Sequence, residues 1–199
     1  VTLGWGISYY LVDLSLVVMG PFTLNTNRFL IAFIVALLIA FPKLKNISKT
    51  TFKFSLLLGG ALVFVYIGAT FGLQYTSLSN AGFLCGLTVI FTPILSAVVY
   101  KKLPNKKQAV VILMSFIGIA LLTLKDDFTV NYDNLPGDLL CIMCAVFYAV
   151  HLLITEKAVT YEDVNPFQLG VLQLGTTGVF NLILAFIFEN PHLPTRAAY

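Results

Sequence analysis

The sequence predicts an all-α polytopic membrane protein with about seven transmembrane helices. Residues 54–100 form a run of 47 residues without Asp, Glu, Lys or Arg. A bilayer core is crossed by roughly 20 apolar residues in a helix, so this run holds two crossings and a turn. The composition agrees, because 58% of the residues are hydrophobic and 11% are charged, whereas soluble proteins carry about 25% charged residues.

Lysines set the expected orientation of these helices. They cluster in residues 43–53 and 101–107, at both ends of the charge-free run, and none lies at its central turn. Positive charge marks cytoplasmic loops, so both ends are predicted to be cytoplasmic. Nine of the 12 Lys and Arg residues are cytoplasmic on this topology. The net charge of +3 is therefore an orientation signal and not a nucleic-acid-binding surface.

Seven apolar segments account for the predicted helices. The chain opens inside the first segment, which is expected to be clipped, and this helix runs from the cytoplasm outward. The acidic connection 125–138 and the end of the seventh helix are then expected outside. The other loops are short, which leaves no room for a soluble domain. The predicted spans are residues 1–18, 22–41, 54–74, 80–100, 108–124, 136–155 and 167–188.

The charge-free hairpin carries two G-x-x-x-G motifs on either side of its turn, residues 75–80. Glycines four residues apart share a helix face and allow close approach, so the two helices are expected to pack together there. Pro93 lies mid-span in the fourth helix and removes one backbone hydrogen bond. It is expected to bend that helix, either as a static kink or as a flexing point. The glycines are Gly68 and Gly72 before the turn and Gly82 and Gly86 after it.

An internal repeat links the two ends of the chain. Pro21-Phe-Thr-Leu opens the second span and Pro166-Phe-Gln-Leu opens the seventh. Arg28 and Gln173 each lie seven residues after the proline, and an aromatic cluster precedes each copy. The repeat spans five helices. Because five is odd, the second copy must be inverted in the membrane, as in many secondary transporters with a site near the midplane.

Polar residues recur at four-residue spacing in several spans, which places them on one helix face. These faces either line a substrate cavity or form interhelical hydrogen bonds, which contribute about 0.6 kcal/mol each in membranes. We interpret the converging stripes as a substrate cavity. Its candidate residues are Trp5, Tyr9, Tyr66, Thr70, Gln74, Asn80, Thr88, Thr92, Tyr148, Gln173, Thr177 and Asn181.

Ionisable groups inside membrane spans are candidates for function because burying charge in lipid is costly. Asp13 and Arg28 lie at similar depth on consecutive helices, so we predict a charge pair that gates the outer vestibule and can orient an anionic substrate. The alternative is a permanent pair that only joins the helices.

His151 is a candidate for proton coupling. The alternative is an interior histidine whose hydrogen bonds are satisfied. Cys141 and Cys144 form a C-x-x-C with no second ligand pair, so we expect packing and no metal or cofactor.

Further residues recur in an order typical of one family. They are Trp5-Gly-x-Ser8, Pro21, Arg28-Phe29, Tyr75-Thr-Ser-Leu-Ser-Asn-Ala-Gly-Phe83, Phe91-Thr-Pro93, Gln108, Gly118 and Gly137-Asp-Leu-Leu140. In these the chain resembles the EamA-type branch of the drug/metabolite transporter superfamily over essentially its whole length. Many members carry Glu in the loop after helix four, where this chain has Lys101-Lys102.

The resemblance implies ten helices in two inverted repeats of five. Residues 1–125 would form the first repeat, and residues 126–199 would form the outer loop and the first two helices of a truncated second repeat. Helices eight to ten would then be missing. In this family helices three, four, eight and nine are important in lining a central cavity.

Together these features predict a multi-pass secondary transporter of the cytoplasmic membrane, with the lipid bilayer and a small organic solute as its partners. The resemblance suggests metabolite or amino-acid-like substrates, often exported. One rival is a non-transporting assembly or sensor subunit, which is favoured if the polar faces contact other helices with no cavity between them. The other rival is a membrane enzyme, which needs a catalytic cluster that the sequence does not contain. No ATP-binding motif is present.

Overall fold

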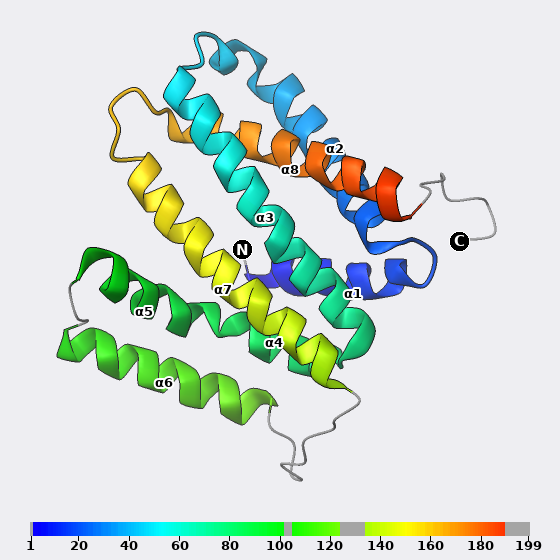
Figure 1. Cartoon of the computed structure of the whole chain (residues 1–199), viewed down its shortest axis with the longest axis vertical. Helices are drawn as coiled ribbons and strands as arrows, with labels where there is room; N and C mark the ends of the chain where they lie inside the picture. The colour runs from blue at the N-terminus through cyan, green and yellow to red at the C-terminus, as the bar shows by residue number, and fades with distance from the viewer. Residues whose placement is uncertain (1, 102–104, 124–133, 190–199) are drawn as a thin grey trace. The chain divides into compact units, whose positions relative to one another are not determined.

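The computed structural model describes residues 2–101, 105–123 and 134–189, and every regular element in these ranges is a helix. The prediction of an all-α polytopic membrane protein is confirmed. The predicted repeat boundary at residues 125 and 126, with most of the acidic outer loop, lies outside the described ranges. The helices are α1 (Thr2–Leu16), α2 (Pro21–Ala40), η1 (Phe41–Leu44), α3 (Lys49–Tyr75), α4 (Leu78–Gly86), α5 (Thr88–Tyr100), α6 (Lys106–Thr123), α7 (Leu135–Ala158) and α8 (Pro166–Phe188) (Figure 1).

Five helical segments of the described residues are long and apolar enough to cross a membrane, compared with seven predicted spans. Each of the other two predicted spans is helical but shorter. Helix α1 has 15 residues, which extend about 22 Å, and α6 has 18 residues that open with two lysines. The five segments are Pro21–Leu44, Lys49–Tyr75, Leu78–Tyr100, Leu135–Ala158 and Pro166–Phe188.

The chain divides into two compact units, and α3 and α7 contribute residues to both of them. Unit 1 comprises Val1–Val63 and Ile154–Tyr199, and unit 2 comprises Phe64–Leu153. Unit 1 thus combines helices from the start and the end of the chain, as expected if the two copies of the sequence repeat pair with each other.

Unit 1 is built around the close packing of α2 on α8, which run side by side (Figure 1). The two helices are antiparallel, because Phe22 stacks on Phe188 at one end while the Lys43 ammonium lies over the Phe167 ring at the other. Between the ends, Gly178 of α8 leaves no space for a Cβ, which would lie 2.7 Å from Leu30 of α2. Small residues therefore allow the two backbones to approach closely.

In unit 2 the glycines of α3 pack on α7. A Cβ on Gly68 would lie 2.5 Å from the Leu140 carbonyl, and one on Gly72 would lie 2.5 Å from the Cys141 sulfur. Gly82 of α4 has nothing within 4 Å of a Cβ position. The expectation that Gly72 and Gly82 bring α3 and α4 together was therefore wrong. A turn fixes the order of two helices along the chain, but it does not fix which of their faces meet.

The predicted fourth span is interrupted at Leu87, between α4 and α5. The backbone N–H of Leu87 bonds to the carbonyl of Leu84, three residues earlier, and Ile90 bonds to Leu87 in the same way. Pro93 lies inside α5, six residues after the interruption. The break in this span therefore lies where α4 ends at Gly86, and not at the proline.

Candidate functional site

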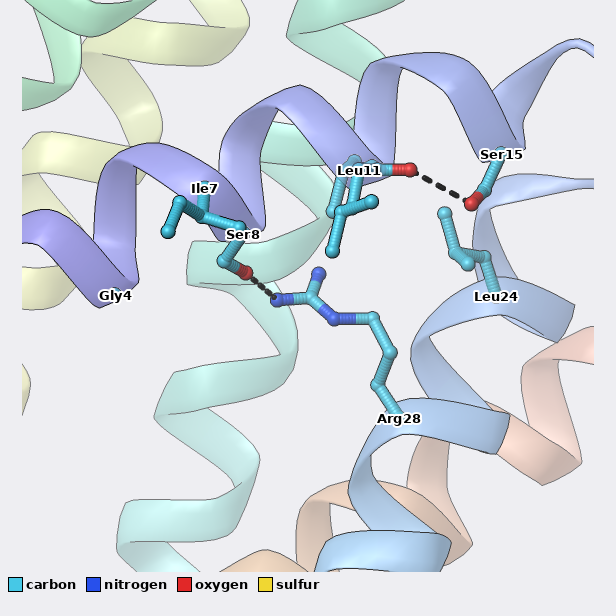
Figure 2. A pocket seen from close by; sticks show the side chains of 8 residues that line it. Gly4, Ile7, Ser8, Leu11, Ser15, Leu24 and Arg28 are labelled. Atoms are coloured by element: carbon cyan, nitrogen blue, oxygen red, sulfur yellow. Dashed lines mark hydrogen bonds between the residues drawn. The ribbon is translucent and has the colours of Figure 1, made fainter.

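A cavity of about 280 Å³ lies between α1 and α2 in unit 1 (Figure 2). Its α1 wall is a single helix face, because its residues recur every three or four positions. Its α2 wall comes from two residues four positions apart. The lining residues are Gly4, Ile7, Ser8, Leu11, Val12 and Ser15 of α1 with Leu24 and Arg28 of α2.

Arg28 supplies the charge of this cavity. The side chain is half-buried, and its guanidinium donates a hydrogen bond of 2.8 Å to the Ser8 hydroxyl of α1 (Figure 2). Ser15 instead donates its hydroxyl to the Leu11 carbonyl of its own helix, at 2.7 Å. Among the described residues that line the cavity, Arg28 is the cation and none is acidic.

Asp13 does not lie in the cavity wall. Its side chain is exposed on α1, and the hydrogen bond recorded for the Arg28 guanidinium goes to Ser8. Residues 8 and 13 are five positions apart, so they point about 140° away from each other around the axis. The pairing of Arg28 with Asp13 stays a prediction.

The start of α2 is held by a carboxylate from the far end of the chain. Glu189, directly after α8, accepts hydrogen bonds of 2.7 Å from the backbone N–H groups of Phe22 and Thr23 and one of 2.9 Å from the Thr23 hydroxyl. Helix N-termini carry free N–H groups and partial positive charge, which a carboxylate satisfies. Gly20 leaves room for this carboxylate, because a Cβ there would lie 2.4 Å from the carboxyl carbon of Glu189 and would displace it.

A second contact of this kind joins the opposite ends of the same two helices. The Gln168 side-chain amide, near the start of α8, donates to the carbonyls of Lys43 and Lys45 at 3.0 and 3.1 Å, just after α2. Thr23 and Gln168 are each the second residue after the repeated proline. These corresponding positions of the predicted repeat therefore lie at opposite ends of the α2–α8 pair. We call these contacts the Glu189 clasp and the Gln168 clasp.

Most of the remaining candidate residues of unit 1 contact other helices or their own helix. Thr177 is fully buried and its hydroxyl lies 3.3 Å from the Gly59 carbonyl of α3 and 2.7 Å from the Gln173 carbonyl. Asn181 is also fully buried and donates to the Thr177 carbonyl at 2.9 Å. Tyr9 and Gln173 are half-buried, and the side chain of Trp5 lies outside the described part.

In unit 2 the candidate residues lie at several separate places. Thr70 is buried on α3, Tyr66 is half-buried and Gln74 is exposed. His151 is buried, with its ring stacked on Tyr148 at 5.8 Å. These placements leave the predicted roles in substrate binding and proton coupling as predictions.

Thr88 marks the interruption between α4 and α5. Its hydroxyl donates to the Cys85 carbonyl at 2.8 Å and lies 3.3 Å from the Ala145 carbonyl of α7. Thr92 donates to the Thr88 carbonyl at 2.7 Å. Irregular backbone within a membrane span is tolerated where other protein groups satisfy its carbonyls, and Thr88 does so for Cys85.

A polar cluster that the sequence reasoning did not single out closes the turn between α3 and α4. Asp138, in the first turn of α7, accepts hydrogen bonds from the Thr76 hydroxyl at 2.7 Å and from the Asn80 side-chain amide at 2.5 Å. Asn80 thus contacts α7 instead of an open cavity. The signal for this cluster was an acid placed directly after a glycine at the start of α7, Gly137-Asp138, within the first helical turn.

The described residues contain no group of three or more His, Cys, Asp or Glu side chains that could hold a metal ion. None of Cys85, Cys141 and Cys144 is in a disulfide, and the last two are buried where α7 packs on α3.

Residues 1–124 match the EamA-like transporter family. This match covers more than half of the chain. The chain belongs to the EamA-like transporter family. The resemblance to the drug/metabolite transporter superfamily that the sequence motifs indicated is therefore confirmed.

Similar proteins carry names that agree with this family. An uncharacterized transporter of Archaeoglobus fulgidus is 34% identical over 152 residues, which cover 76% of this chain and 45% of that protein. The uncharacterized transporter YcxC of Bacillus subtilis is 30% identical over 157 residues, with 76% and 50% covered. The chain thus spans about half the length of these curated relatives. A solved crystal structure matches the fold with a TM-score of 0.68 at 18% identity, covering 97% of this chain and 69% of that one.

Proposed function

We propose that this EamA-family chain is part of a secondary transporter that moves a small organic solute across the cytoplasmic membrane by alternating access between inverted repeats. The observation that carries the proposal is the α1–α2 cavity, where a charged guanidinium lies between two apolar helices. A charge at such a place is tolerated when it faces water or a partner group. The equivalent clasps of α2 and α8 support an inverted repeat around it.

The rival proposal is that the chain is a non-transporting assembly subunit, and it is supported by the hydrogen bonding of the polar helix faces. Thr177, Asn181 and Thr88 are buried and bonded to carbonyls of their own or neighbouring helices. If every polar face were used in this way, no solute path would remain. The α1–α2 cavity argues for transport, and a flux measurement separates the two proposals.

The test is solute flux in proteoliposomes that contain the full-length protein, with a panel of carboxylates, amines and nucleosides and with or without a proton gradient. Gly4 lines the cavity and Gly6 does not, and neither has an atom within 4 Å of a Cβ position. Gly4→Leu should therefore fill the cavity without a clash and reduce flux at least tenfold. Gly6→Leu is the matched control and should retain flux. Equal flux in both variants would count against this cavity as part of the path.

Membrane orientation gives a second check of the proposal. Lys49 should be labelled from the cytoplasmic side and Asp133 from the outside when each is replaced by Cys, because the lysine-rich loops are expected to be cytoplasmic. Labelling of both positions from one side would exclude the inverted-repeat topology.

A further inference from the structure

We infer that residues 41–53, which connect α2 to α3, bind the headgroup of an anionic phospholipid such as phosphatidylglycerol. We call these residues the lysine segment. The segment joins two stretches that are each long and apolar enough to cross a membrane, Pro21–Leu44 and Lys49–Tyr75, so it lies at the bilayer surface. It carries four lysines and no acidic residue, and lysines in such a place attract anionic headgroups. The lysines are Lys43, Lys45, Lys49 and Lys53.

Two of these lysines lie where the helix itself disfavours positive charge. Lys49 is the first residue of α3, and the first turn of this helix contains no acidic side chain. A helix N-terminus carries partial positive charge, so a cation there is unfavourable. Lys53 lies four residues further along on the same face, and like charges at this spacing also repel each other. An anionic group beside Lys49 and Lys53 relieves both repulsions.

Contacts with α8 hold the backbone of the lysine segment in place. The Gln168 clasp joins the side chain of Gln168 to the carbonyls of Lys43 and Lys45. The Lys43 ammonium lies 5.4 Å from the centre of the Phe167 ring. Because these contacts already order the segment, less conformational entropy is lost when its lysines bind a common partner.

Exposed apolar side chains in the same segment favour a lipid over a soluble anion. Phe41 is 66% exposed, Phe52 55% and Ile47 39%. Segments that lie in the bilayer interface combine such side chains, which enter the acyl boundary, with lysines whose ammonium groups stay at the headgroups. A phospholipid offers both a negative phosphate and acyl chains, whereas free phosphate would use only the lysines.

Acidic side chains on the neighbouring connection limit the positive potential of this surface. Glu162 and Asp163 are exposed between α7 and α8, and the Thr51 hydroxyl of α3 donates to the Asp163 backbone carbonyl at 3.4 Å. Their carboxylates repel an anionic headgroup. Glu162→Gln should therefore bind phosphatidylglycerol at least as tightly as the unchanged protein, and weaker binding would contradict a site made by lysines.

The test is lipid binding to the full-length protein in detergent, measured by native mass spectrometry. The two probes are dioleoylphosphatidylglycerol and dioleoylphosphatidylcholine, which share their acyl chains and differ in the net charge of the headgroup. We expect the phosphatidylglycerol to bind at least tenfold more tightly. Equal affinity for the two lipids overturns the inference without any mutation. Glycerol 3-phosphate, which lacks acyl chains, should not displace the lipid at equal concentration, and displacement would indicate a soluble-anion site instead.

Variants then assign the site. Changing the four lysines of the segment to Gln should weaken binding of phosphatidylglycerol at least tenfold and leave phosphatidylcholine unaffected. The matched control removes the same charge from the other lysine-rich connection and should retain the preference. Loss of the preference in the control alone overturns the inference. If the fourfold variant does not fold, unchanged affinity in both the Lys43/Lys45 and the Lys49/Lys53 pair variants overturns it as well. The control substitutions are Lys101→Gln, Lys102→Gln, Lys106→Gln and Lys107→Gln.

Gln168→Ala separates a fixed site from general attraction between lysines and an anionic bilayer. It keeps every lysine but removes the two hydrogen bonds that hold the segment, so binding of phosphatidylglycerol should weaken several-fold. Gln173→Ala on the same helix is the control and should bind normally. Normal binding in Gln168→Ala would contradict a preorganised site. These results do not depend on solute flux, so the inference stands or falls separately from the proposed transport function.

Discussion

The two ends of the α2–α8 pair are held by different chemistry, although the positions that hold them are equivalent in the sequence repeat. At one end the Glu189 clasp places a carboxylate on three donors at the start of α2. At the other end the Gln168 clasp places a neutral amide on two carbonyls after α2. A charged acceptor on a helix N-terminus gains from hydrogen bonds and from the helix dipole, so the Glu189 end should be the more firmly held.

The two ends show that similar contacts between α2 and α8 can be made by an acceptor at one end and by a donor at the other. The start of α2 presents N–H donors, which need an acceptor, and the partner helix supplies Glu189. The start of α8 is already capped by Asn165, whose side chain accepts from Phe167 and Gln168. The Gln168 side chain acts instead as a donor toward the carbonyls of Lys43 and Lys45, in and just after η1, and carbonyls are the groups left over at a helix C-terminus.

Separating α2 from α8 should disrupt both clasps together and cause the largest loss in the free energy of unfolding. Gly178→Leu inserts a side chain where even a Cβ would lie 2.7 Å from Leu30, and overpacking of this kind costs about 3 kcal/mol. We expect a loss of about that size in the free energy of unfolding, measured by SDS titration in mixed micelles. Gly170→Leu on the same helix has open space at its Cβ and is the control. Equal stability of the two variants would show that close backbone approach does not hold the pair.

Removal of the Glu189 clasp should cause the second-largest loss in the free energy of unfolding. Glu189→Ala leaves the N–H groups of Phe22 and Thr23 without their carboxylate, and we expect a loss of about 2 kcal/mol. Glu189→Gln keeps an oxygen acceptor but removes the charge, so it should lose about half as much. If Glu189→Gln is as harmful as Glu189→Ala, the charge is essential; if it is harmless, the charge has no part in the clasp and the contrast with the other end disappears.

The Gln168 clasp should show the smallest effect. Gln168→Ala removes two neutral hydrogen bonds to the carbonyls of Lys43 and Lys45, which should cost about 1 kcal/mol. The same SDS titration measures it. Gln173→Ala, on the same helix but outside this clasp, tests whether loss of any glutamine from α8 has the same effect. A loss larger than that of Glu189→Ala would reverse the order of the two ends.

Sequence reasoning predicted the helical class and most of the spans, because hydropathy is a local property, while the inverted repeat stays a prediction. It predicted a pair between Arg28 and Asp13 from their similar depth in the membrane, without considering their positions around the helix axis. Five residues separate Ser8 from Asp13, and only Ser8 lies on the cavity face with Leu11, Val12 and Ser15. That distinction was available from the sequence.

The clasps and the Asp138 cluster could not be predicted in the same way. Glu189 bonds to residues 167 and 166 positions earlier, and no periodic pattern connects positions so far apart. The partner of Gly72 likewise depends on which helix covers that face, and in unit 2 it is α7. Contacts of this kind follow from tertiary packing, which a single sequence does not specify.

The interruption at Leu87 has a consequence for how the protein enters the membrane during synthesis. Helix α4 has 9 residues and α5 has 13, so at 1.5 Å per residue they reach about 14 and 20 Å, and neither alone spans a bilayer core of about 30 Å. The two halves must therefore pass through the insertion machinery together. One carbonyl that contacts the Thr88 hydroxyl belongs to Ala145, which the ribosome adds 57 residues later. Thr88 is thus synthesised before its partner on α7 exists, and the junction acquires its complete set of contacts only after α7 has been made.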